Sequence, residues 1–403
     1  MRNELHHYQG LDPGIDTHKD TLHVAVISAV GGEVADREFP ATSGGYRAVT
    51  EFLDSHDVGV VGVECTSSYG RGITSALQAT GLSVAEVYGA RKDTKRIKGK
   101  SDPLDAVAAA RAVLADDGIA TPKDERTNMV RTLHLARRSG VKARTAAINQ
   151  IKAILIGAPV TLREKYSGTT VSTLVKALVS CRPNAHTDPI VVTALSALKA
   201  LAKRVQFLDE QDRDLTGQID ALVNQMNPAL RAAYGVGPDT AAQLIITAGP
   251  NPQRLRSEAS FAALCGAAPV PASSGKTTRH RLSRGGDRAA NNALHRIALV
   301  RMSSHRPTRE YVQRQLASGL SKKEILRKLK RAIAREMFKL LTRVLEIDDY
   351  SDLRPTRQAK NLTLTAAAGH FGTWPNDISR LERGLKRDDT LADAYRQWLT
   401  DAA

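Results

Sequence analysis

The first 115 residues alternate between strand-like and helix-like patterns of apolar positions. The segment "GIDTHKDTLHVAVIS" predicts two strands joined by a turn at residues 17–20, and "EVADREFP" predicts a third strand. The segment "SGGYRAVTEFLDSH" has the spacing of an amphipathic helix, while "VGVVGVECT" and "LSVAEVYG" predict a buried central strand and one more strand. Strands that alternate with covering helices indicate an α/β domain, which we place at residues 8–120.

Helical periodicity replaces this pattern over residues 121–230. Residues 127–156 form a basic amphipathic pattern, and apolar residues then recur at intervals of three and four from Val191 to Met226. About five heptads of this kind predict a coiled coil, packed either on the earlier helix or on another subunit. Asp212 interrupts the stripe, either to fix register and partner or as a solvated irregularity.

Glycine, proline, serine and arginine become more frequent over residues 231–350. The stretch "YGVGPDTAAQLI" is typical of a helix-hairpin-helix turn that offers backbone N–H groups to a phosphate, or of a tight turn between helices. The cationic stretch "PASSGKTTRHRLSRGGDR" follows, and residues 321–345 predict another basic helix. Residues 351–403, the tail, contain no motif that we can interpret.

The charge balance narrows the choice of partner. The formal net charge is +16 and aromatic residues make up 4% of the chain, which favours nucleic acid bound mainly through its phosphates. Three widely spaced cysteines indicate a reducing compartment, with neither a disulfide framework nor a metal-ligand pattern. We expect a soluble cytoplasmic protein without a membrane partner, because neither a signal peptide nor a membrane-spanning apolar run is visible.

Two carboxylates stand one helical turn apart in "KSDPLDAVAAARA", directly after the basic run "RKDTKRIKG". Asp102 and Asp105 fit a helix start, with Asp102 as N-cap and Pro103 as the first helical residue. They also fit half of a site for Mg²⁺ (or Mn²⁺), which requires further acids. Asp16 in the first strand and Glu64 at the end of the central strand supply them, since four converging carboxylates are stable only around cations.

These motifs together carry a resemblance. The chain to about residue 345 resembles the DEDD transposases of the insertion-sequence family numbered one hundred and ten, which are related to the Piv invertase. The matching stretches are "GIDTHKDTLHVAVI", "GVECTSSYG", "KGKSDPLDAVAAARA" and the distal segment from "GVGPDTAAQLI" through "CGAAPVPASSGKTTRHRLSRGGDRAANNALHRIA". The family has an RNase H-like (RuvC-like) N-terminal domain, a coiled-coil arm and a mainly α C-terminal transposase domain.

The resemblance also implies roles for individual residues. Asp16, Glu64, Asp102 and Asp105 would form the catalytic metal-binding tetrad, and Ser274, with Ser273 as the alternative, would be a serine nucleophile. The family further implies donor and target DNA as partners, a structured "bridge" RNA as guide, and association with the prokaryotic nucleoid. The phosphate-binding candidates are Arg91, Lys92, Lys95, Arg96, Lys98, Lys100, Arg137, Arg138, Lys142, Lys276, Arg279, Arg281, Arg284 and Arg288.

Three functions remain compatible with the sequence. The first is a recombinase that breaks and rejoins DNA as a dimer to tetramer, assembled through the stripe at residues 191–226. The second is a RuvC-like nuclease, specific for Holliday junctions or other structures, that hydrolyses without rejoining and needs no serine nucleophile. The third is a non-catalytic nucleic-acid-binding scaffold, in which the four acids are caps and strand ends.

Overall fold

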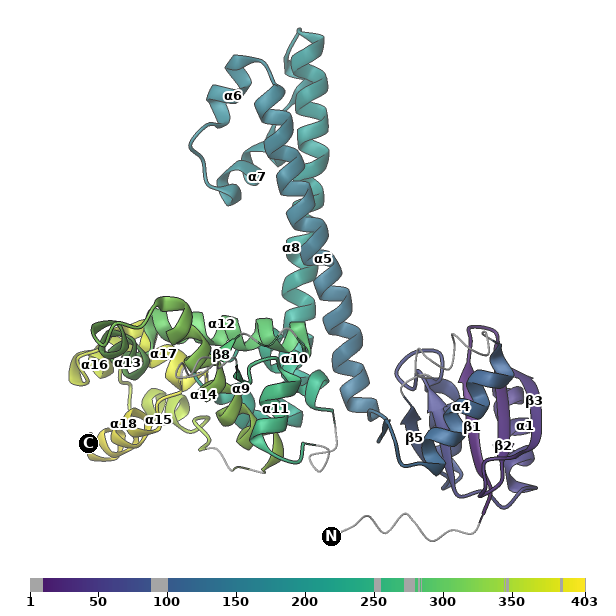
Figure 1. Cartoon of the computed structure of the whole chain (residues 1–403). Coiled ribbons are helices and arrows are strands. Elements are labelled where there is room, and N and C mark those ends of the chain that lie inside the picture. Colours follow the sequence, from purple (N-terminus) through teal and green to yellow (C-terminus); the bar gives the residue numbers. More distant parts are fainter. Residues whose placement is uncertain are drawn as a thin grey trace. The chain divides into compact units, whose positions relative to one another are not determined.

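The computed structural model describes residues 10–87, 101–249, 255–271, 280–281, 283, 285–343, 345, 348–384 and 387–402 (Figure 1). The chain forms two compact units, Met1–Asn128 and Met129–Ala403. None of the helices in the described ranges is both long enough and apolar enough to cross a membrane.

A mixed sheet forms the centre of the first unit. Within the described residues its strand order is β3-β2-β1-β4-β5-β6. β1 pairs antiparallel with β2, which pairs antiparallel with β3, whereas β1, β4 and β5 are parallel neighbours. The five predicted strands are thus confirmed, and the short β6 was not predicted. The strand bounds are β1 Asp12–Thr17, β2 Thr21–Ile27, β3 Glu33–Pro40, β4 Val60–Glu64, β5 Ser83–Val87 and β6 Ile119–Ala120.

Helices cover both faces of this sheet. α1 (Ser43–Asp54) and α2 (Arg71–Ala79) share a core with Ile15 and Val63. α4 (Asp102–Leu114) lies on the opposite face, where Gly14 and Gly62 leave room for it (Figure 1). A Cβ atom on Gly14 would stand 2.2 Å from backbone atoms of α4, so helix and strand approach each other closely only because glycine is present.

Two long helices make up the first part of the second unit, and the first four residues of α5 still belong to the first unit. α5 (Glu125–Gly157) and α8 (Pro189–Met226) lie side by side, and α6 (Val160–Tyr166), α7 (Val171–Ser180) and the 3₁₀ turn η1 (Pro183–Ala185) connect them (Figure 1). Apolar residues of α5, α6 and α7 bury Leu195, Leu198, Ala202 and Val205 of α8. This part of the predicted stripe is therefore covered within the chain, so it gives no argument for a second subunit. Homo-oligomerisation stays a prediction.

Asp212 also finds its partner within the chain. Arg137 of α5 places its Nε atom 3.0 Å from Oδ1 of Asp212 and donates a 2.7 Å hydrogen bond to Thr216. An internal ion pair thus explains the polar interruption of the stripe, and it fixes how α5 and α8 align.

A helical core follows α8 in the chain. Apolar residues from α8, α10, α11, α12 and α14 form one buried cluster. The element bounds are α9 Pro228–Ala232, α10 Pro238–Ala248, α11 Glu258–Leu264, β7 Val270–Pro271, β8 His280–Arg281, α12 Arg288–Ser304, α13 Arg306–Ala317 and α14 Lys322–Thr342.

The tail, which the sequence left uninterpreted, forms a small bundle of its own. α15 (Leu353–Ala359), α16 (Leu364–His370), α17 (Pro375–Glu382) and α18 (Asp389–Asp401) surround a separate apolar core that includes Tyr350. We call residues 350–402 the tail bundle.

Candidate active site

Asp16 and Glu64 lie at the carboxyl ends of neighbouring parallel strands. The register pairs Gly14 with Gly62 and Ile15 with Val63, so Asp16 and Glu64 are the next pair along. Side chains alternate across a strand, and Asp16 and Glu64 therefore share the face that Gly14 and Gly62 present to α4. The Thr17 hydroxyl donates a 3.2 Å hydrogen bond to the carbonyl oxygen of Glu64, which ties the two strand ends together.

The first turn of α4 brings Asp102 and Asp105 to the same face. The prediction that Asp102 is the N-cap was wrong by one residue: Ser101 has the extended cap conformation, and both acids lie in the first helical turn with Pro103 between them. Asp105 is buried, at 5% exposure, so it is not a solvated capping residue. The first turn of α4 therefore lies near the carboxyl end of β1, where His18 contacts Asp102.

His18 was missed by the sequence reasoning. Its Nε2 atom lies 3.2 Å from Oδ2 of Asp16 and 3.1 Å from Oδ1 of Asp102. It follows Asp16 by two residues, so it projects on the same side of the chain just past the end of β1. The motif "GIDTHKD" contained this signal, but a histidine beside one acid gives no indication of a second acid far along the chain.

The electrostatics of Asp16 indicate a site for a cation. The Asp16 side chain is 7% exposed. Burial raises the pKa of Asp16 most, and the charges of Asp105 and Asp102 raise it further, against the lowering effect of His18. Ligand atoms of Asp16, His18 and Asp102 lie within 4.8 Å of one another. The group therefore has oxygen donors and a negative charge that His18 offsets only in part, and both features suit a divalent cation.

Backbone strain marks the turn directly after Glu64. Cys65 has a φ of 53°, in the left-handed region that non-glycine residues rarely adopt. Its carbonyl oxygen accepts hydrogen bonds from the N–H groups of Ser68 and Gly70, which hold the turn in place. Strain of this kind persists where the surroundings fix it, and here it adjoins the acidic cluster.

The comparisons with known proteins agree with this geometry. A model of IS110-type DEDD transposases, described as "Transposase", matches residues 13–158, which include all four acids. A second model, "Transposase IS116/IS110/IS902 family", matches residues 227–313, and the two together cover more than half of the chain. The chain belongs to the IS110 family of transposases.

A curated relative belongs to the same element type. It is the "Insertion element IS110 uncharacterized 43.6 kDa protein" of Streptomyces coelicolor, which is 32% identical over 145 residues. That similarity spans 35% of this chain and 36% of the relative.

The second region matched by the IS110 family contains the predicted serines. β7 and β8 pair antiparallel, Val270 with Arg281 and Pro271 with His280. Residues 272–279, with Ser273, Ser274, Lys276 and Arg279, join these strands in the sequence and lie outside the described residues, as does Arg284.

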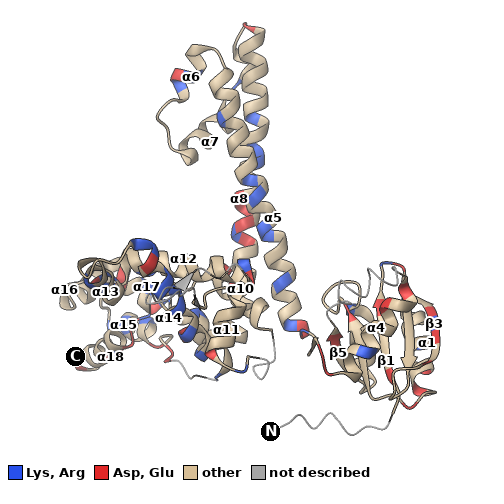
Figure 2. Ribbon diagram, viewed as in Figure 1, with Lys and Arg blue, Asp and Glu red and all other residues tan. Residues whose placement is uncertain are grey.

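The predicted phosphate contacts outside residues 272–284 divide into three groups. Arg138, Lys142 and Arg288 are exposed, in agreement with a role at the surface, and basic residues recur along α5 (Figure 2). Arg137 is 16% exposed and occupied by internal partners, so the structure does not present it to a ligand. The basic run with Arg91, Lys92, Lys95, Arg96, Lys98 and Lys100 lies outside the described residues.

The turn predicted in "YGVGPDTAAQLI" lies directly before α10, and an acid, Asp239, follows it. Gly235 has a φ of 79° before α10, whose first turn contains Asp239. Burial alone would raise the pKa of Asp239, but hydrogen bonding from His134 and the charges of Arg137 and Arg296 hold it well below the usual range. The Asp239 carboxylate is bound by side chains of α5 and α12, and both readings of the turn stay open.

Proposed function

We propose that this IS110-family chain cuts and rejoins the DNA of a mobile insertion sequence. The observation that supports the proposal is that Asp16 and Glu64 end neighbouring parallel strands, while Asp102 and Asp105, in the first turn of α4, act on the charge of Asp16. A scaffold without catalysis would have no use for a buried carboxylate whose neighbours are also acids, because such a group lowers the stability of the fold. The strand-end and helix-start positions of the acids support an RNase H-like (RuvC-like) domain.

The acidic cluster would hold Mg²⁺ or Mn²⁺. Carboxylate oxygens would come from Asp16, Glu64, Asp102 and Asp105. His18 contacts Asp16 and Asp102, so the His18 side chain would shift when a cation binds between them. A bound divalent ion supplies charge stabilisation to the phosphodiester that reacts. The chain's own contribution is to orient these acids, which the close packing of α4 on Gly14 and Gly62 achieves.

The second catalytic group in the proposal is Ser274, with Ser273 as the alternative. Attack by the serine oxygen on phosphorus forms an O–P bond and breaks the bond from phosphorus to the deoxyribose oxygen. The proton lost by the serine hydroxyl is taken up by this leaving oxygen. The phosphoserine link conserves the bond energy, so the reverse attack by a DNA hydroxyl rejoins a strand without an external energy source. Lys276, Arg279 and Arg281 are cations near these serines in the sequence and would stabilise charge on the phosphate.

The test is to trap the protein on a nicked DNA substrate from which the cleaved strand cannot rejoin, and to map the adduct by mass spectrometry. We expect an adduct on Ser274 in the wild-type chain and none in Asp102→Asn. Asp54→Asn, which neutralises an exposed acid at the end of α1, is the matched control and should behave like wild type. An adduct on Ser273 would move the nucleophile by one residue. Cleavage that survives in the double Ser→Ala variant without an adduct would establish the hydrolytic nuclease instead.

We also propose that a structured RNA encoded beside the gene guides the choice of DNA, and that the working form is a dimer to tetramer in the cytoplasm at the nucleoid. The family resemblance and the net charge of +16 support RNA as a partner. Protein purified from cells that carry the whole element should retain flanking transcript in preference to other RNA. Recovery of cellular RNA without that enrichment would contradict guidance while leaving the cutting chemistry in place.

A further inference from the structure

The tail bundle contains two short helices joined by a tight turn. α16 ends at His370 and α17 begins at Pro375, so residues 371–374 form the connection. Gly372 has a φ of 59°, which lets the chain reverse direction, and the Thr373 hydroxyl donates a 3.3 Å hydrogen bond to Asp377 at the start of α17. Two helices joined by a short turn that contains glycine form a helix-turn-helix.

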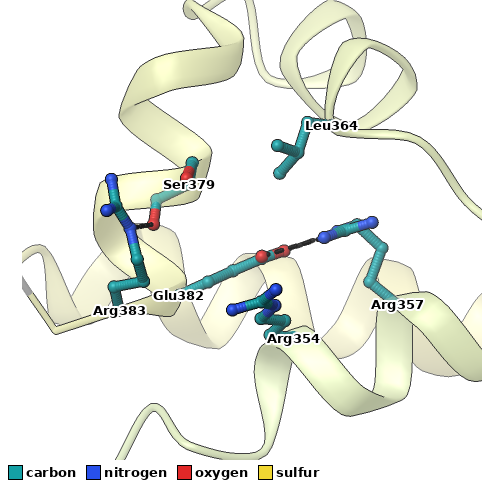
Figure 3. Close-up of a pocket in the computed structure, with 6 residues that line it drawn as sticks. All are labelled: Arg354, Arg357, Leu364, Ser379, Glu382 and Arg383. Atoms are coloured by element: carbon teal, nitrogen blue, oxygen red, sulfur yellow. Dashed lines mark hydrogen bonds and ion pairs between the residues drawn. The ribbon is translucent and has the colours of Figure 1, made fainter.

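One face of α17 is locked into the bundle. Ile378 and Leu381 are fully buried in the apolar core. Glu382, whose side chain is 2% exposed, accepts hydrogen bonds of 2.6 and 3.0 Å from Arg357 (Figure 3). It also accepts one of 2.8 Å from Tyr395. α17 is therefore anchored to α15 and α18, and its orientation does not depend on a ligand.

The opposite face of α17 is exposed and polar. Asn376, Arg380 and Arg383 are exposed at positions i, i+4 and i+7, which align on one side of a helix. The side chains of Asn376 and Arg380 show no hydrogen bond or ion pair within the part of the tail that the structure describes. Asn and Arg are the residues that read adenine and guanine through paired hydrogen bonds.

Two other features flank this face. Trp374, at the end of the turn, is 77% exposed, which is unusual for the largest amphipathic side chain. A pocket of about 290 Å³ opens beside α17, with Arg354 and Arg383 among the residues that line it (Figure 3). Cations beside a reading helix are the groups that fix a protein on the DNA backbone.

We propose that the tail bundle is a DNA-binding domain that reads duplex sequence directly, with α17 in the major groove. An α-helix fits this groove, and the second helix of a helix-turn-helix contacts base edges there. Asn376 and Arg380 read bases, while Arg354 and Arg383 contact phosphates. This goes beyond the cutting chemistry, because it gives the chain a protein-encoded choice of sequence besides any choice made by an RNA.

The first test is selection of bound sequences by the full-length protein from random duplexes, without divalent metal. We expect a shared motif, which Asp102→Asn selects as well, since reading does not require cutting. Arg380→Ala should lower the preference for that motif over a scrambled duplex by roughly 5- to 150-fold, which is the discrimination of one paired hydrogen-bond contact. Asn376→Ala should relax a different position of the motif.

Lys360→Ala is the matched control. Lys360 is an exposed cation at the end of α15, and its ammonium group donates to carbonyl oxygens of Thr400 and Ala402 next to α18. Its loss should weaken binding to both duplexes equally, as a non-specific charge does. Absence of a motif, or a motif and preference unchanged in both Asn376→Ala and Arg380→Ala, would overturn the proposal.

Tryptophan fluorescence provides a second readout in the whole chain. The sequence has two tryptophans, Trp374 and Trp398, and both lie in the tail bundle. Trp398 stacks on His370 and Tyr395, so Trp374 is the exposed reporter. The motif duplex should shift the emission of wild type but not of Trp374→Phe. An emission spectrum of wild type that stays unchanged at saturating duplex would contradict contact at this surface.

Discussion

Neutralising Glu382 should unfold the tail bundle while the rest of the chain stays folded. In Glu382→Gln the shape of the side chain is kept, but Arg357 loses the carboxylate that accepts from its Nε and Nη2 atoms. Arg357 is itself buried, with a side chain 10% exposed. The carbonyl oxygen of Leu362 at 2.7 Å and the amide oxygen of the glutamine still accept from it, but neither carries a charge. The substitution therefore leaves a charge in the bundle interior without a counter-charge.

The expected loss is comparable to the whole stability of the bundle. Removing one partner of a buried ion pair costs about 3–5 kcal/mol. A domain with the length of residues 350–402 has roughly 3–8 kcal/mol of stability in total, at about 0.05–0.15 kcal/mol per residue. Tyr395→Phe, which removes a hydrogen bond to the same carboxylate, should cost about 1.5–3 kcal/mol and leave the bundle folded but weaker.

Urea denaturation followed by tryptophan fluorescence measures this change in the full chain, because Trp374 and Trp398 report on the tail bundle alone. Circular dichroism follows the remaining helices in the same samples. Glu310→Gln is the control, since it neutralises the acid of an exposed Arg–Glu pair with Arg306 and should leave both signals unchanged. A shift of less than about 1 kcal/mol in Glu382→Gln would refute the reasoning, because it would mean that the pair is solvated.

Three further substitutions test other parts of the molecule. Asp16→Asn should abolish cutting yet raise the melting temperature of the metal-free protein, because it removes a buried charge. A lower melting temperature would contradict the repulsion between Asp16 and the carboxylates of Asp102 and Asp105. Gly14→Ala should destabilise the first unit by about 1–3 kcal/mol or more in urea denaturation, since its Cβ meets the backbone of α4, whereas Gly44→Ala in α1 should not. Leu208→Glu should weaken the packing of α8, as seen by circular dichroism, without changing the mass in light scattering; a halved mass with unchanged stability would show an intersubunit seam.

The strands of the first unit could be predicted because their signals are local, whereas the four acids were brought together by their order along the chain and by the family resemblance. Alternation of apolar residues over β1 and β2 and the β-branched run of β4 each need only a short window of sequence. The approach of α4 to the sheet could not be predicted, because it depends on the missing side chains of Gly14 and Gly62 on two separate strands. The sequence could not decide which helix packs on α8 for a related reason. A stripe of apolar residues has the same spacing whether it packs on α5 or on another chain.

The tail bundle shows where local patterns become insufficient. α15 and α16 have seven residues each and α17 has eight, so each repeats its apolar pattern for only about two turns. Their arrangement depends instead on a pair 25 positions apart, Arg357 and Glu382, and single charged residues in a sequence usually indicate a solvated surface. The spacing of Asn376, Arg380 and Arg383 acquires meaning only once the buried face of α17 is known.

Two buried carboxylates of this chain, Glu382 and Asp16, differ in the charges that surround them. Glu382 is surrounded by Arg357 and Tyr395, so its charge is compensated inside the fold and helps to orient α17. Asp16 is buried beside Asp102 and Asp105, and His18 offsets their effect only in part. The raised pKa of Asp16 means that its ionised form destabilises the metal-free fold at neutral pH, and this penalty is relieved as the pH falls through that pKa. A compensated acid is complete without a ligand, whereas an uncompensated one must be neutralised by a proton or a cation from outside. The same physical rule gives Glu382 a structural role and supports the binding role that we propose for Asp16.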